Sequence, residues 1–141
     1  MTKIVSVHSF RGGTGKSNTS ANMAAQLALA GKRVAVIDTD VQSPGIHVLF
    51  GFDEDMEGSM LNDYLYGNCP IVDCAHDVTD RVGATSGSLY LVPASIKAGD
   101  IAKVLRQGYD VEVLNEGFRA LVKGLDLDVL VIDTHPGLNE E

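Results

Sequence analysis

Basic residues, cysteine and long apolar runs are all scarce in this sequence. It has 11 lysines and arginines against 19 aspartates and glutamates, which gives a formal net charge of −8. Because duplex-binding surfaces neutralise phosphates with lysine and arginine, this balance argues against a nucleic-acid interface spread over the chain. No apolar run reaches the roughly 20 residues that span a bilayer, and the N-terminus has no secretory pattern. We therefore expect a cytoplasmic protein, with neither direct nucleic-acid nor membrane contact from this portion.

The two cysteines are too few for a metal centre within one chain. Cys69 and Cys74 have four residues between them, which is not a C-x-x-C pair. Two thiols alone do not supply the four ligands of a structural zinc or iron–sulfur site. We expect reduced thiols, and the alternative is a cluster shared between two subunits.

The remaining composition is that of an ordinary globular domain, with 45% hydrophobic and 21% charged residues in a chain of 141. Short apolar runs predict strands at 3–7, 33–38, 88–92 and 127–133, and helical spacing predicts helices at 17–30, 59–66, 100–106 and 110–123. The second and last of these strands are continuously apolar, which indicates a parallel sheet buried on both faces. The sequence therefore predicts an α/β fold with a doubly wound, mostly parallel sheet flanked by helices.

Capping residues mark the ends of the predicted helices. Gly31 closes the first helix in the position that a left-handed cap prefers. Asp100 and Asp110 are placed to accept hydrogen bonds from the free N–H groups that begin the last two helices, and Gly124 follows the end of the last one. The face of that last helix directed to the core is predicted to carry Val111, Leu114, Phe118, Leu121 and Val122.

A glycine-rich loop joins the first predicted strand to the first helix, with the sequence Arg11-Gly12-Gly13-Thr14-Gly15-Lys16-Ser17. A phosphate chain needs many hydrogen-bond donors at short range and little side-chain bulk. Glycines let successive backbone N–H groups point inward, and the helix start adds its own free N–H groups and the positive end of its dipole. Lys16 supplies an ammonium for the β- and γ-phosphates, and the Ser17 hydroxyl is placed for Mg²⁺. The loop therefore predicts a nucleotide site.

Three motifs together resemble the ParA/MinD family of P-loop ATPases. The basic residue directly before Gly-Gly resembles the family's deviant Walker A motif, K-G-G-x-G-K-T/S. The segment Asp38-Thr39-Asp40-Val41-Gln42 resembles the family's D-x-D-x-Q switch, and residues 129–137 resemble its apolar strand that ends in D-x-x-P-G. The motifs occur in the family's order over nearly the whole chain.

The resemblance implies ATP and Mg²⁺ as cofactors and a role for each matching residue. Lys16, Asp40 and Arg11 would be catalytic, with Asp40 orienting or polarising the attacking water. Ser17, Asp38 and Asp133 would serve the metal, the two aspartates near it rather than as its main ligands. The nucleotide would lie against Arg11, Gly12, Gly13, Thr14, Gly15, Lys16, Ser17 and Asn18.

Two residues depart from the family pattern. Arg11 stands in place of the signature lysine, which in such proteins reaches across a dimer, and its planar fork also suits phosphate oxygens. Asn18 stands where the family often has threonine, and it can still donate to an α-phosphate.

The resemblance implies an ATP-driven dimerisation switch that positions or partitions a cargo, with a homodimer and an unidentified cargo or adaptor protein as partners. Residues 1–141 would be the truncated N-terminal portion of a single P-loop ATPase domain, which leaves strand 3–7 as an apolar edge open to self-association. Two alternatives stay open: a nucleotide-binding or scaffold module without turnover, and an iron–sulfur carrier on the same scaffold.

Overall fold

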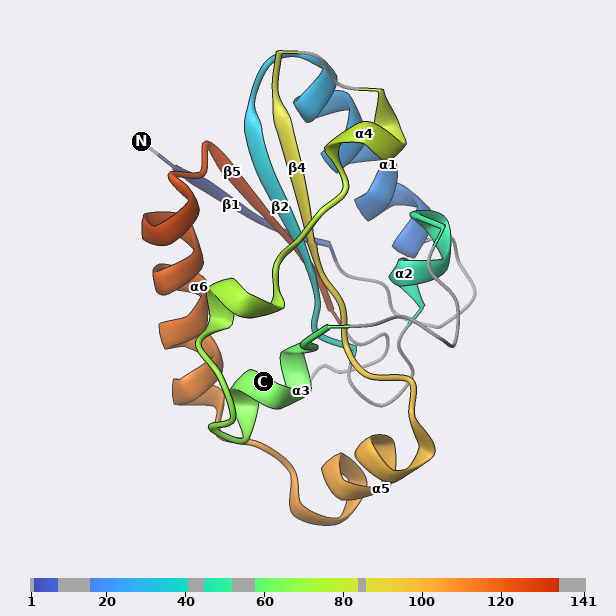
Figure 1. Ribbon diagram of the computed structural model, residues 1–141, viewed down its shortest axis with the longest axis vertical. Helices are drawn as coiled ribbons and strands as arrows, with labels where there is room; N and C mark the ends of the chain where they lie inside the picture. Colours follow the sequence, from blue (N-terminus) through green and yellow to red (C-terminus); the bar gives the residue numbers. More distant parts are fainter. Residues whose placement is uncertain (1, 8–15, 41–44, 52–57, 84–85, 135–141) are drawn as a thin grey trace.

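The computed structural model describes residues 2–7, 16–40, 45–51, 58–83 and 86–134, and for residues 16–18 only the backbone. Its elements alternate between strands and helices along the chain (Figure 1). They are β1 (Lys3–Val7), α1 (Lys16–Leu29), β2 (Arg33–Asp38), α2 (Ile46–Leu49), α3 (Leu61–Leu65), the 3-10 helix η1 (Ile71–Cys74), β3 (His76–Asp77), α4 (Thr79–Val82), β4 (Ser88–Val92), α5 (Ala98–Gln107), α6 (Val111–Leu125) and β5 (Val129–Asp133).

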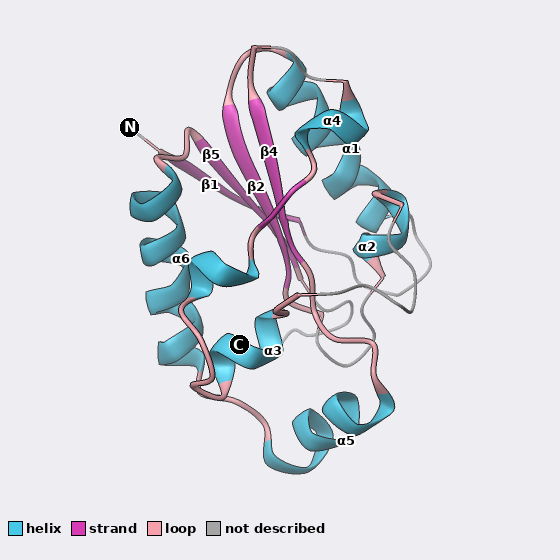
Figure 2. Cartoon of the chain, in the orientation of Figure 1, coloured by secondary structure: helices cyan, strands magenta, loops and turns pink. Residues whose placement is uncertain are grey.

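The strands form one five-stranded sheet in the order β1-β5-β2-β4-β3. All pairs are parallel except β3 with β4, so the predicted α/β class with a mostly parallel sheet is confirmed (Figure 2). The sequence did not predict β3, which has only two residues, nor the short helices α2 and α4. Because the four longer strands run the same way, their carboxyl ends meet at one edge of the sheet.

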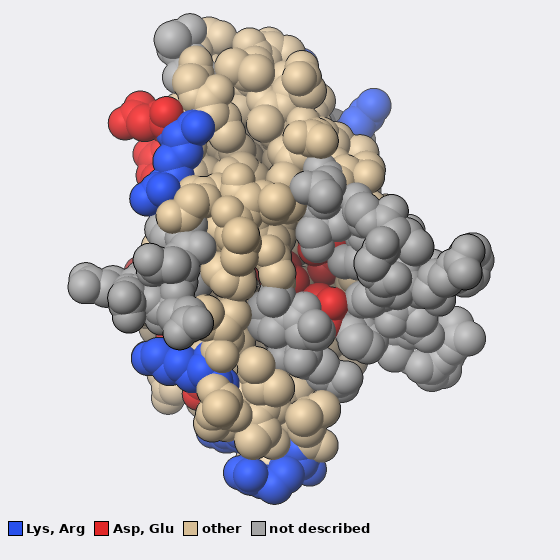
Figure 3. Space-filling view, turned by 90° about the vertical axis from the view of Figure 1, so that its right-hand side faces the viewer, with Lys and Arg blue, Asp and Glu red and all other residues tan. Residues whose placement is uncertain are grey.

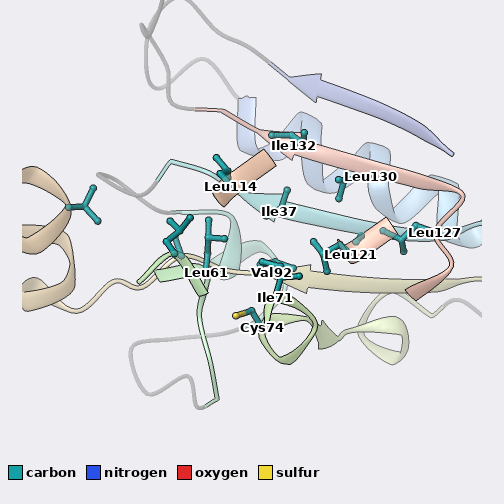
Figure 4. Close-up of a cluster of buried hydrophobic side chains, with 14 residues drawn as sticks. Ile37, Leu61, Ile71, Cys74, Val92, Leu114, Leu121, Leu127, Leu130 and Ile132 are labelled. Atoms are coloured by element: carbon teal, nitrogen blue, oxygen red, sulfur yellow. The ribbon is translucent and has the colours of Figure 1, made fainter. Parts of the chain in front are cut away.

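Helices cover both faces of the sheet, as continuous apolar strands require. Along β2, Val34 and Val36 point to one face, where they pack with α1 through Ala24 and Ala28. These small side chains let α1 lie close to the strands. Ile37 points to the other face, where the larger core cluster lies between the sheet, α3, η1 and α6 (Figure 4).

Helix α6 begins as the sequence predicts and ends differently. The Asp110 carboxylate accepts a hydrogen bond from the Glu112 N–H at 2.9 Å, which confirms the predicted cap. Gly124 lies inside the helix, and the left-handed position after the helix is occupied by Asp126, with φ 53°. Leu114 and Leu121 are buried as predicted, whereas Val111 is 59% exposed because it occupies the first, outward-facing turn.

Helix α5 lies at the lower end of the view in Figure 1 and begins earlier than predicted. Its N-terminal cap residue is Lys97, so the prediction that Asp100 caps the helix is wrong. The Asp100 carboxylate instead accepts from Ser95 Oγ at 2.6 Å. At the C-terminal end of α5, the Tyr66 hydroxyl donates a hydrogen bond to the carbonyl of the cap residue Gly108 at 2.6 Å. Figure 3 shows Lys and Arg atoms gathered at this end and acidic atoms near the centre of the same face.

Strand β1 lies at one edge of the sheet and pairs with β5. The side chain of Ile4 is 54% exposed there, so this edge strand presents apolar surface to solvent. Across the described ranges, no helix combines the length and the apolar character needed to cross a membrane.

Candidate functional site

Two aspartates stand side by side where β2 and β5 end. Asp38 and Asp133 are the last residues of their strands and are register partners in the parallel pair. They are 0% and 1% exposed. Residues 95 positions apart in the chain are thus brought together by the sheet, at the edge where open α/β sheets bind ligands.

The first part of α1 reaches the same point. Ser20 Oγ donates to Asp133 Oδ1 at 3.0 Å, and both residues are buried. Since α1 begins at Lys16, its N-terminus lies one turn from this hydrogen bond. The positive end of the helix dipole is therefore close to the paired carboxylates. Sequence reasoning missed Ser20, although it shares a stripe with Ala24 and Ala28 at four-residue spacing.

The Asp38 carboxylate is held by backbone donors from the segment that follows it. Oδ1 accepts from the Asp40 N–H at 3.0 Å, and Oδ2 accepts from the Gly45 and Ile46 N–H groups at 3.2 and 3.4 Å. Burial and then the neighbouring Asp133 charge raise its pKa from 3.8 to about 7, against the smaller effect of these N–H groups. A carboxylate in this position gains from a nearby cation, because the protein leaves part of its charge uncompensated.

Two threonine hydroxyls form hydrogen bonds between the strand ends next to Asp38 and Asp133. The Thr39 N–H and Oγ1 both donate to the Asp133 carbonyl, at 2.9 and 2.8 Å. The Thr134 Oγ1 donates to the Val7 carbonyl at 2.7 Å. The ends of β1, β5 and β2 are therefore fixed relative to each other. Asp40, also buried at 6% exposure, follows directly after Thr39.

A second polar group lies at the end of β4, beside the end of β2. Asn62 Oδ1 accepts from the Ser95 N–H at 2.8 Å, and Ser95 is linked in turn to Asp100. The Leu61 N–H donates to the Pro93 carbonyl at 2.7 Å. These hydrogen bonds join the start of α3 to the end of β4. The sequence did not predict them because they connect residues more than 30 positions apart.

Part of the predicted site is described and part is not. The structure brings Asp38, Asp40 and Asp133 together and begins a helix at Lys16. The predicted residues Arg11, Gly12, Gly13, Thr14 and Gly15 lie outside the described residues, as do Val41, Gln42 and residues 135–137. For Lys16, Ser17 and Asn18 only the backbone is described. Their assigned roles therefore stay predictions.

The carboxylate pair suits a metal that completes its ligands from a phosphate and water. Within the described ranges, no three histidine, cysteine, aspartate or glutamate side chains converge on a common point. Mg²⁺ does not need such a cage, because it usually keeps several waters and takes one or two carboxylates together with phosphate oxygens. Buried, oxygen-rich and next to a helix N-terminus, the site fits this mode of binding.

Comparisons with known proteins agree with the sheet and the motifs. A family model described as an AAA domain (AAA_31) matches residues 2–140. The septum site-determining protein MinD from Pyrococcus horikoshii, solved in complex with Mg-ADP, is 28% identical with a TM-score of 0.77 and is matched over 99% of this chain and 51% of its own. Cobyrinic acid a,c-diamide synthase from Mycobacterium smegmatis, solved with ADP and magnesium, is 27% identical with the same TM-score of 0.77, over 99% of this chain and 53% of its own.

A curated relative has a different role. An iron–sulfur cluster carrier protein from Methanocaldococcus jannaschii is 35% identical over 141 residues, which is 99% of this chain and 42% of that protein. The chain spans about half the length of the curated relatives that it matches. The proteins that this chain resembles therefore include a septum site-determining protein, a diamide synthase and an iron–sulfur cluster carrier, and the first two were solved with ADP and magnesium.

Proposed function

The chain belongs to the AAA_31 family of AAA domains and is of the ParA/MinD type, and on this basis we propose that it binds ATP with Mg²⁺ and hydrolyses it slowly as a dimerisation switch. The observation that carries the proposal is the buried pair of Asp38 and Asp133 beside the start of α1. Burial and the neighbouring charge raise the pKa of Asp38, so its ionised form is costly, and a magnesium-bound nucleotide would offset that cost.

Each residue has a proposed part in phosphoryl transfer. Lys16 and the backbone of the preceding loop would bind the phosphates, and the Ser17 hydroxyl would help to hold the metal. Asp38 and Asp133 would stabilise the metal with their negative charge, while Asp40 would orient the attacking water. Bound Mg²⁺ would supply charge neutralisation at the β- and γ-phosphates. Phosphoryl transfer needs little beyond this positioning and electrostatic stabilisation.

Dimerisation is proposed to depend on Arg11. In place of the family's signature lysine, its guanidinium would contact phosphate oxygens across the interface between two copies. ATP, with its γ-phosphate, would then favour the dimer more than ADP does. The switch would position or partition a cargo through an adaptor protein.

An iron–sulfur carrier is the second candidate, because a relative with that role is 35% identical over nearly the whole chain. Cys69 and Cys74 have sulfur atoms 3.6 Å apart, but two thiols from one chain supply only half of a four-ligand set. A cluster would need two copies of the chain. Iron content and visible absorption after reconstitution distinguish this candidate, since the ATPase alone has neither.

Calorimetry with ATP and ADP in the presence of Mg²⁺ tests the proposed site. Lys16→Ala should abolish binding, whereas Lys32→Ala removes an equally charged side chain about 20 Å away, past the other end of α1, and should not change the affinity. Circular dichroism confirms that both variants are folded. Equal ATP affinity for Lys16→Ala and the unmodified chain would refute the site assignment.

A phosphate-release assay then separates the switch from a module without turnover. Binding accompanied by slow release supports the ATPase, and release should disappear in Asp40→Asn while binding persists. Tight binding without release over many hours would favour the non-hydrolysing alternative. Light scattering with ATP and with ADP measures dimerisation, which should weaken in Arg11→Ala.

A further inference from the structure

Two thiols lie in contact on the side of the sheet opposite to α1. Cys69 precedes η1 and Cys74 is its last residue. Their Sγ atoms are 3.6 Å apart, which is close to van der Waals contact. Both cysteines are free thiols. Contact between two sulfur atoms within one short segment is the arrangement from which a disulfide forms with little movement, to a bond of about 2.05 Å.

The two thiols differ in access. Cys69 is half-buried, so a small reagent in solvent can reach it. Cys74 is fully buried in the core cluster that Figure 4 shows, and its thiol donates to the Met60 carbonyl at 3.1 Å. Burial raises the pKa of the Cys74 thiol, which keeps it protonated and unreactive toward outside reagents. The pair therefore has one accessible and one protected member, the arrangement of an attacking and a resolving cysteine.

We propose that Cys69 and Cys74 form a reversible intramolecular disulfide, with a low-molecular-weight disulfide such as oxidised glutathione as the oxidant. The Cys69 thiolate attacks one sulfur of oxidised glutathione, the glutathione S–S bond breaks, and one glutathione thiolate leaves. Cys74 then gives up its proton, and its thiolate attacks Cys69 Sγ. The S–S bond between Cys69 and glutathione breaks, and the second glutathione leaves as a thiolate that takes up the proton. Two protein thiols are oxidised, and one oxidised glutathione is reduced to two glutathione thiols.

The new bond changes a contact at the start of α3. Once Cys74 loses its proton, the Met60 carbonyl loses its thiol donor. Met60 directly precedes Leu61 and Asn62, which bind the Pro93 carbonyl and the Ser95 N–H at the end of β4. Formation of the disulfide would therefore alter a contact of Met60, the residue directly before the two that bind the end of β4.

Intact-mass measurement of the full chain tests the proposal. The native protein is incubated in glutathione buffers of stepped ratio, acid-quenched, alkylated and weighed. The expected product has lost the mass of two hydrogen atoms, takes no alkylating reagent and returns to two free thiols with dithiothreitol. Approaching the same buffer from the reduced and from the oxidised side should give the same fraction.

Variants identify the order of the steps. Cys74→Ser should stop at one glutathione adduct on Cys69, and Cys69→Ser should leave Cys74 unmodified while the chain is folded. Cys74→Ala serves as a second resolving-cysteine variant if the serine at this buried position impairs folding. The proposal is overturned if the unmodified chain keeps a glutathione adduct, stays reduced in the most oxidising buffer, or gives only disulfide-linked dimers on a non-reducing gel.

Discussion

Ionisation of Asp38 should make the metal- and nucleotide-free chain less stable as the pH rises from about 4 to about 7. Burial, and then the Asp133 charge, raise the pKa of this carboxyl from 3.8 to about 7 in the folded state. Between these values the folded chain keeps a proton that the unfolded chain has lost, so an increase in pH favours unfolding. Below about 4 both states are protonated, and above about 7 both are ionised and the loss is complete.

The expected loss is large for a domain of this size. An interval from 3.8 to about 7, at about 1.4 kcal/mol for each pH unit, corresponds to about 4 kcal/mol. This is an upper bound, because the interior relaxes around a new charge. A small domain has a free energy of unfolding of about 5–15 kcal/mol, so even half of this loss is measurable by urea denaturation.

His47 acts in the opposite direction and must be separated from Asp38. Burial lowers the pKa of His47 below 6.5, so the unfolded chain binds more protons there and stability rises with pH toward 6.5. Asp38→Asn removes the carboxyl and leaves His47 in place. The difference in unfolding free energy between the unmodified chain and this variant therefore reports Asp38 and its interaction with Asp133, without the contribution of His47.

The sign of that difference should reverse with pH. An amide keeps one oxygen acceptor but turns an NH₂ group toward backbone donors, which costs about 1–3 kcal/mol at pH 4, where the native carboxyl is neutral. At pH 8 the variant avoids the buried charge and should equal or exceed the unmodified chain. Asp73→Asn, at an exposed position, is the control and should follow the native curve. Parallel curves for Asp38→Asn and the unmodified chain from pH 4 to pH 8 would refute the assignment of a raised pKa.

Strands were predictable because their signal is local. The runs at Lys3–Val7, Arg33–Asp38 and Ser88–Val92 have the predicted bounds. The last strand begins at Val129 rather than at 127, since the Leu127 N–H still bonds the Val122 carbonyl at the end of α6. Strand β3 has no pattern of its own, and its pairing with β4 arises from tertiary packing.

Caps were predictable only where no distant group competes for the same side chain. Asp110 and Asp100 carry the same sequence signal. Asp110 caps its helix, while the carboxylate of Asp100 is taken by Ser95, whose position is set by the end of β4. The left-handed residue after α6 is likewise Asp126 and not Gly124, because aspartate tolerates this conformation and the helix continues through the glycine.

The candidate site shows the same division. Motifs identified the aspartates at 38, 40 and 133, but only the sheet register makes Asp38 and Asp133 neighbours. The contact of Ser20 with Asp133 depends on how α1 crosses the sheet, which is a property of packing. No sequence motif includes Ser20, and its burial beside a carboxylate became evident only from the fold.

Two further perturbations test how the helices pack against the sheet. At Gly87 an added Cβ would overlap backbone carbonyl oxygens, which cannot turn aside as a side chain can, so Gly87→Ala should cost about 1–3 kcal/mol. Gly99→Ala, with no neighbouring atoms within 4 Å, should be neutral or stabilise α5 by up to about 1 kcal/mol, and equal costs for the two would contradict the close contact. Leu121, at 0% exposure, joins α6 to the core cluster, whereas Leu105 on α5 is 62% exposed. Truncation of Leu121 to alanine removes apolar contacts and leaves a cavity that fixed strands cannot fill, which predicts a loss of about 2–5 kcal/mol in urea unfolding, against less than about 0.5 kcal/mol for Leu105→Ala. A loss below about 1 kcal/mol at Leu121 would mean that α6 does not pack on the sheet as described.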